Sequence, residues 1–66
     1  MISLNQIREG SRVVVRGDFG TGRPVQATVV MADSDIKNGR PGIDYTTDDG
    51  DERWAYLTQV DRVIKY

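Results

Sequence analysis

The sequence predicts a small all-β domain of five strands, and three observations support this fold class. Apolar residues alternate with a period of two instead of the roughly 3.6 of a helix, as in residues 12–16, where Val13 and Val15 share a face. The apolar segments are short and rich in β-branched residues. Glycine-rich and polar turns separate them. A chain of 66 residues has room for one domain, which we assign to residues 1–66.

The first half of the chain contains two predicted strands and two predicted loops. Residues 12–16 form the first strand. Residues 17–24 hold three glycines and a proline, and no helix follows to complete a phosphate-binding turn, so they are expected to form a flexible loop. Residues 25–31 form the second strand, with Val25, Ala27, Val29 and Met31 on one face. The polar stretch 32–42 contains the turn dipeptide Asn38-Gly39 and is expected to be a loop.

The second half contains three more predicted strands. Residues 43–47 and 51–57 form a hairpin with Asp49-Gly50 at the two central turn positions. Residues 58–60 form one 3₁₀ turn, and residues 61–66 form the closing strand.

A short helical turn is expected before the first strand. Residues 3–9 are the only segment with a helical signal, because Ser3 and Gln6 have the spacing of a capping box. Leu4 and Ile7 are then expected to cover one open end of the strand assembly.

Three segments carry a resemblance to a known superfamily. They are the first strand with its leading glycine (residues 9–15), the central hairpin (residues 42–45 with Asp49-Gly50) and the final turn and strand (residues 57–64). In this order they resemble the SH3-like small-barrel superfamily, which includes Tudor, KOW and SH3 domains. The resemblance implies a five-stranded SH3-like barrel and says little about function. An OB-fold is the alternative, but it usually needs more residues and a helix between strands three and four.

The residue types missing from the chain argue against catalysis. The sequence has no cysteine and no histidine. It therefore lacks disulfides, thiolate metal sites and the usual general base near neutral pH. We expect a protein that is not an enzyme and has no cofactor.

Acidic residues crowd the central hairpin: Asp44, Asp48, Asp49, Asp51 and Glu52. Carboxylates suit calcium or magnesium, but the spacing does not match an EF-hand, and a two-residue turn cannot surround an ion. A solvated hairpin tip without a metal is the interpretation that we favour.

Four aromatic residues are the candidate partner-binding residues: Phe19, Tyr45, Trp54 and Tyr56. Trp54 and Tyr56 are two apart and share a face, which Tyr45 is expected to join across the hairpin. Aromatic side chains give large, rigid contact area, so such a face predicts a protein–protein interaction or regulatory module. The alternative, that the single tryptophan anchors the core, remains open from sequence.

Nucleic-acid binding is an alternative function. Arg12, Arg16 and Arg23 could form a stripe that contacts phosphates. The net charge of −1 offers no basic excess, and residues 31–61 carry a balance of −5. The same arginines could instead pair with the acidic hairpin.

A third hypothesis is a structural or oligomeric accessory subunit of a phage or plasmid system, whose sheet edge docks on a larger protein or on a second copy. No apolar run approaches the roughly 20 residues of a membrane span, and the first residues lack a signal-peptide core. We therefore expect no membrane association, a cytoplasmic location and a complete small protein of bacterial or phage type.

Overall fold

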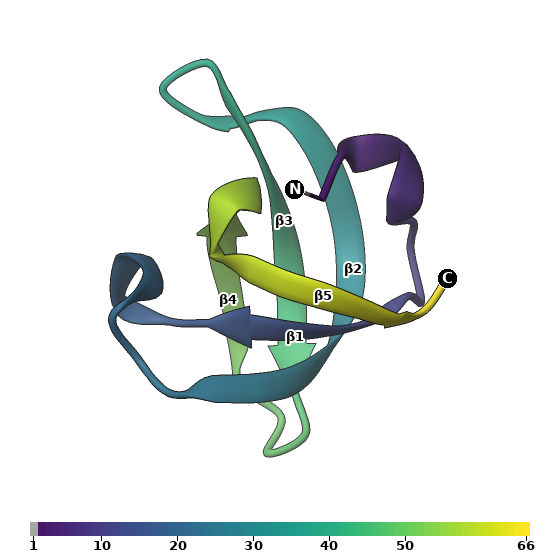
Figure 1. The fold of residues 1–66 in the computed structure, drawn as a ribbon, viewed down its shortest axis with the longest axis vertical. Helices are drawn as coiled ribbons and strands as arrows, with labels where there is room; N and C mark the ends of the chain where they lie inside the picture. The colour runs from purple at the N-terminus through teal and green to yellow at the C-terminus, as the bar shows by residue number, and fades with distance from the viewer. Residues whose placement is uncertain (1) are drawn as a thin grey trace.

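The computed structural model describes residues 2–66, which form one five-stranded antiparallel sheet (Figure 1). The strands are β1 (Arg12–Arg16), β2 (Pro24–Lys37), β3 (Arg40–Thr47), β4 (Glu52–Tyr56) and β5 (Val60–Lys65). Their order in the sheet is β4-β3-β2-β1-β5. Among the described residues β4 and β5 do not pair with each other, so the sheet is not closed. The all-β, five-stranded prediction is confirmed.

Helical structure in the described residues is limited to three short turns: η1 (Leu4–Gln6), η2 (Asp18–Gly20) and η3 (Leu57–Gln59). None of the described helices is long and apolar enough to cross a membrane. The expected N-terminal turn is present but shorter than residues 3–9. Its capping box is formed, with the Ser3 amide donating to Gln6 Oε1 at 2.8 Å.

Strand β2 connects the two halves of the sheet. Its first residues pair with β1, from Arg12 opposite Thr28 to Arg16 opposite Pro24. From Ala27 onward it pairs with β3, so that Ala27 and Thr28 have partners on both sides. In Figure 1 the strand curves strongly as it passes from one partner to the other. One long, bent strand therefore takes part in both halves of a very small sheet.

A bulge lies in the middle of β2. Val29 pairs with Tyr45 while Met31 pairs with Asp44, so the bulge adds one residue to β2. The inserted residue reverses the alternation of side chains beyond it. The prediction that Met31 lies on the same face as Ala27 and Val29 is therefore wrong: those two residues are buried, Met31 is 46% exposed, and Ala32 packs against the core instead. Val25, at the other end of the predicted apolar face, is also exposed.

The β2–β3 connection is much tighter than the sequence suggested. Residues 32–42 were expected to form a loop, but β2 continues to Lys37 and β3 begins at Arg40. Lys37 pairs with Arg40 across Asn38 and Gly39, whose φ angles of 57° and 71° are those of a two-residue hairpin turn. This stretch forms a two-stranded ribbon, and most of its polar side chains are exposed.

The β3–β4 connection is longer than predicted by one residue. Thr47 pairs with Asp51, with its amide donating to the Asp51 carbonyl at 2.9 Å. The loop is therefore Asp48, Asp49 and Gly50, and Gly50 has the positive φ of 93° that three-residue hairpin loops require at this position. The predicted two-residue turn is wrong, and this shift changes the register of β4.

The core consists of nine buried side chains contributed by every strand and by the N-terminal segment. They are Ile7, Val13, Val15, Ala27, Val29, Ile43, Tyr45, Ala55 and Val60. Ile7 has the expected position over the strands, whereas Leu4 lies outside the cluster.

Turn η3 is attached to the core sheet by one buried glutamine. Gln59 Oε1 accepts from the Tyr56 amide at 2.9 Å, and its Nε2 donates to the Arg16 carbonyl at 2.8 Å. These bonds connect the end of β1 to the turn between β4 and β5. The predicted 3₁₀ turn is confirmed, one residue earlier than expected.

Gly42 is the position where an added methyl group has no room. A Cβ there would collide with the Ala55 carbonyl oxygen and with the Ile36 side chain. We expect Gly42→Ala to destabilise the fold by about 1–3 kcal/mol, because a packed backbone must shift. Urea denaturation followed by circular dichroism measures the effect.

Gly17→Ala is the matched control for that substitution. A Cβ at Gly17 meets nothing within 4 Å, and the residue has an ordinary φ of −71°. Its denaturation midpoint should stay close to that of the wild type. Equal midpoints for the two variants would contradict the tight packing of β3 against β4.

Candidate functional site

The register of β4 on β3 decides which aromatic side chains reach the surface. Ala55 pairs with Ile43, and both are fully buried. Trp54 and Tyr56, its neighbours in the strand, therefore point away from the core. Trp54 is partly exposed and does not belong to the core cluster, which answers the question that the sequence left open.

Phe19 packs on the same face of β4 as Trp54 and Tyr56, where Tyr56 is itself buried at 9% exposed and lies outside the core cluster. The Phe19 ring centroid lies 6.2 Å from that of Trp54 and 6.3 Å from that of Tyr56. Trp54 and Tyr56 pack edge to face at 5.1 Å with an interplanar angle of 88°. We call these three residues the aromatic cluster. The structure thus brings together three of the four predicted partner-binding residues.

Phe19 is held in place by an unusual backbone. It has a φ of 58° in the middle of η2, and the preceding Asp18 has a φ of 50°. A non-glycine residue in this left-handed region costs roughly 1 kcal/mol or more. Two hydrogen bonds to the Gly17 carbonyl, from the Gly20 and Gly22 amides at 3.0 Å each, close the loop around it. The segment expected to be a flexible loop is therefore a turn with its own hydrogen bonds.

The tip of the β2–β3 ribbon covers the other side of the cluster. The Lys37 ammonium lies 4.6 Å from the Trp54 ring centroid, and the Arg40 guanidinium lies 4.0 Å from that of Tyr56. Asn38 Nδ2 donates to the Tyr56 hydroxyl at 2.9 Å. Sequence reasoning missed these three residues because it treated the ribbon as a loop. Reading Asn38-Gly39 as a hairpin turn would have found them.

Tyr45 does not join the cluster, so its predicted place beside Trp54 and Tyr56 is wrong. It is only 2% exposed and belongs to the core. The cause is the three-residue loop, which places Tyr45 opposite Arg53 instead of Trp54. A register shift of one residue moves a side chain to the opposite face of the sheet.

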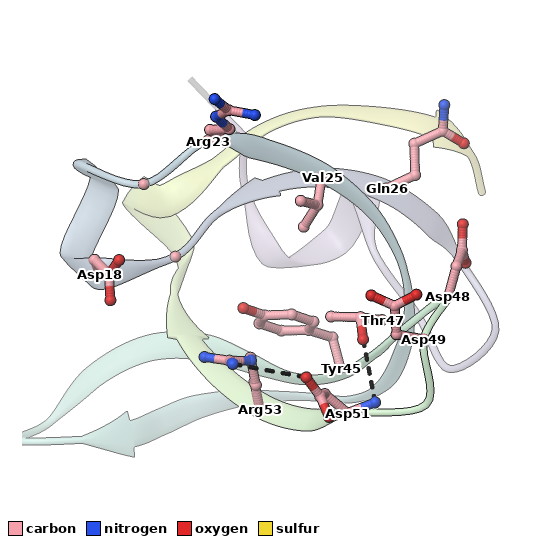
Figure 2. A pocket seen from close by; sticks show the side chains of 12 residues that line it. Asp18, Arg23, Val25, Gln26, Tyr45, Thr47, Asp48, Asp49, Asp51 and Arg53 are labelled. Carbon is pink, nitrogen blue, oxygen red and sulfur yellow. Dashed lines mark hydrogen bonds and ion pairs between the residues drawn. The ribbon is translucent and has the colours of Figure 1, made fainter.

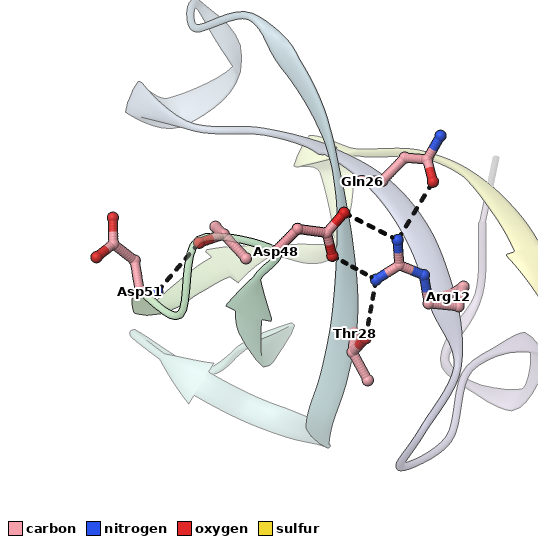
Figure 3. Close-up of polar contacts among 6 residues, drawn as sticks. Arg12, Gln26, Thr28, Asp48 and Asp51 are labelled. Carbon is pink, nitrogen blue, oxygen red and sulfur yellow. Dashed lines mark hydrogen bonds and ion pairs between the residues drawn. The ribbon is translucent and has the colours of Figure 1, made fainter.

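Two of the three arginines proposed for phosphate contact are engaged within the chain. Arg12 reaches across to Asp48 with its two terminal nitrogens, at 2.9 and 3.2 Å, and also donates to Thr28 and Gln26 (Figure 3). Arg16 Nε pairs with Asp61 at 2.8 Å. Nucleic-acid binding through these side chains would require them to give up existing ion pairs. Arg23 is exposed and lies at the rim of a cleft.

This cleft lies at one end of the sheet, between the β1–β2 loop and the β3–β4 hairpin (Figure 2). It is open to solvent and has a volume of about 650 Å³. Its walls include Tyr45 and several charged side chains, among them Asp18, Arg23, Asp49, Asp51 and Arg53.

The acidic residues of the hairpin are spread out, not gathered around a point. Asp48, Asp49, Asp51 and Glu52 are exposed, and Asp44 is half-buried on β3. Across residues 2–66 no three acidic side chains are grouped so that they could hold a metal ion.

No family model, no curated protein and no solved structure matches this chain.

The contact between Phe19 and Trp54 can be tested through fluorescence, because Trp54 is the only tryptophan. Phe19→Ala removes a ring that covers one edge of Trp54, so acrylamide should quench Trp54 more strongly in the variant. Ile64→Ala, which truncates an apolar side chain that is 44% exposed on β5, is the control and should leave quenching unchanged. Identical quenching in Phe19→Ala and the wild type would show that the cluster does not form in solution.

The ion pair between Arg12 and Asp48 predicts how stability responds to acid. The hydrogen bond from Arg12 lowers the pKa of the Asp48 carboxyl below its ordinary value of 3.8. The pair therefore contributes its small stabilisation above pH 3.8, and this is lost as pH falls through the lower folded-state pKa.

The difference in melting temperature between wild type and Asp48→Asn should accordingly be present at neutral pH and shrink in strong acid. Asp49→Asn, in the same loop and without an ion pair in the described residues, should show a smaller difference at neutral pH. If the melting temperature of Asp48→Asn differed from that of the wild type by the same amount at every pH, the charge of Asp48 would be excluded as the cause.

Proposed function

We propose that this chain is a non-enzymatic binding module that recognises a segment of a protein partner through the aromatic cluster. The observation that carries the proposal is Phe19, which is 74% exposed although it contacts two other aromatic rings. A ring in this position has one side fixed by packing and the other side free for a ligand.

The cluster has the physical properties of a binding surface. Aromatic side chains have few rotatable bonds, so fixing them on binding costs little entropy for the area that they bury. Here the rings are fixed further by their edge-to-face contacts and, for Tyr56, by the hydrogen bond from Asn38. A preorganised apolar surface loses less free energy on association than a mobile one.

The charges around the cluster indicate the chemistry of the partner. Lys37 and Arg40 lie over the rings and make no ion pair among the described residues. Carboxylates on the partner could pair with both cations while an apolar side chain packs against Phe19. We therefore infer that the preferred segment carries an apolar or aromatic residue next to acidic ones.

We also propose that the sheet is an SH3-like small barrel. The order β4-β3-β2-β1-β5, the bend in β2 and the single turn η3 between β4 and β5 support this assignment, together with the sequence resemblance. The β1–β2 loop and the β2–β3 ribbon are separate in sequence. Both border the aromatic cluster in this fold.

Selection from a random peptide library displayed on phage tests the proposed function. Enriched peptides should share an apolar residue flanked by Asp or Glu. Their affinity, measured by fluorescence polarisation of labelled synthetic peptides, should fall at least about tenfold in Phe19→Ala, since hot-spot aromatic residues contribute about 2 kcal/mol or more.

Ile64→Ala serves as the control here too, because it truncates an exposed apolar side chain on a strand outside the cluster. Peptide affinity should be unchanged in this variant. Failure to enrich any peptide, or enriched peptides that bind Phe19→Ala as well as they bind the wild type, would overturn the proposal.

A further inference from the structure

A second candidate site, independent of the aromatic cluster, is the cleft at the end of the sheet. The β1–β2 loop contributes Asp18 and Arg23, and the β3–β4 hairpin contributes Asp49 and Asp51 (Figure 2). These side chains surround the end of the core, where Tyr45 lies.

Ion pairs within the chain leave the cleft with uncompensated negative charge. Asp48 is paired with Arg12, and Asp51 lies 3.7 Å from Arg53. Asp18 and Asp49 have no ion pair among residues 2–66. Since only Arg23 remains to balance these two carboxylates, the cleft attracts cations.

Tyr45 adds a polar group that has no partner. Its side chain is almost entirely buried, yet its hydroxyl group has no hydrogen bond among the described residues. No fully enclosed side-chain oxygen or nitrogen in residues 2–66 lacks a partner, so this hydroxyl oxygen is not fully enclosed, and Tyr45 is one of the residues that line the cleft. Figure 2 shows the Tyr45 side chain within the ring of cleft residues.

The hydroxyl is also kept in its neutral form. Burial raises the pKa of Tyr45 above its ordinary value of 10.0, so it stays protonated throughout the physiological range. A neutral phenol can accept a hydrogen bond through its lone pairs. The Tyr45 hydroxyl has no hydrogen bond within the described residues, so it is free to accept one from a ligand in the cleft.

We propose that the cleft binds the guanidinium group of an arginine side chain from a partner. Guanidinium presents five N–H donors in a planar fork, which can reach several acceptors at once. Asp18 and Asp49 lie on opposite sides of the cleft with Tyr45 between them, so a guanidinium group that reaches Tyr45 enters a cleft with a carboxylate on either side (Figure 2). A metal ion would need oxygen ligands gathered around one point, and the described residues contain no such group.

The test is an NMR titration of the ¹⁵N-labelled protein at neutral pH with N-acetyl-L-arginine amide. Amide signals from the β1–β2 loop and the β3–β4 hairpin should move and saturate. N-acetyl-L-citrulline amide, which has nearly the same shape but no charge, should cause no saturable change.

Three variants locate the interaction. Tyr45→Phe removes only the hydroxyl and should weaken binding about 2- to 10-fold. Asp18→Asn should weaken it about 2- to 5-fold. Glu52→Gln removes the same charge from β4 at a position outside the cleft lining and should leave the affinity nearly unchanged.

Several results would overturn the proposal. They are the absence of saturable shifts, equal shifts with the citrulline compound, or equal weakening by Asp18→Asn and Glu52→Gln, which would indicate a general charge effect. Binding of arginine that persists when the phage-display selection fails would support the cleft while rejecting the aromatic cluster.

Discussion

The arrangement of both surfaces depends on one constraint, the three-residue loop between β3 and β4. Gly50 takes the positive φ that this loop requires, and Thr47 consequently pairs with Asp51. Every later pair in the hairpin follows from this register. It places Ala55 opposite Ile43 inside the protein and sends Trp54 to the outside. With a two-residue loop, Tyr45 would be opposite Trp54, and the two side chains would share one face of the sheet.

A small core leaves little choice about which aromatic residues are enclosed. The nine side chains of the core are mostly valine, isoleucine and alanine, with one tyrosine. Trp54 and Tyr56 are instead covered by Phe19 and by the tip of the β2–β3 ribbon, which pack on the opposite face of the sheet. The domain therefore has its main apolar packing on one side of β4 and a second, partly exposed aromatic cluster on the other.

Strand periodicity and turn dipeptides were enough to predict the fold class, the number of strands and the shared face of Trp54 and Tyr56. Phe19 was a candidate partner-binding residue, but no sequence pattern placed it against these two rings. The failures arise where one residue changes a register. The bulge in β2 moves Met31 outward, and no local sequence pattern predicts this bulge. The loop at Asp48–Gly50 is one residue longer than the Asp-Gly pair suggested, so Tyr45 is inside. The alternation of Ile43 with Tyr45 did carry that information, since residues two apart in a strand share a face.

The turn at Asp18 and Phe19 has a further consequence for the behaviour of the domain. These neighbouring residues both have left-handed backbone conformations, and their side chains serve different surfaces: Phe19 the aromatic cluster, Asp18 the cleft. A ligand that displaces one of them moves the shared turn and so perturbs the other. Thermodynamic linkage makes this coupling reciprocal. If a ligand on the aromatic cluster changes the affinity of the cleft by some factor, a ligand in the cleft changes the affinity of the aromatic cluster by the same factor. Two ligands of this domain would therefore sense each other through a single turn of backbone.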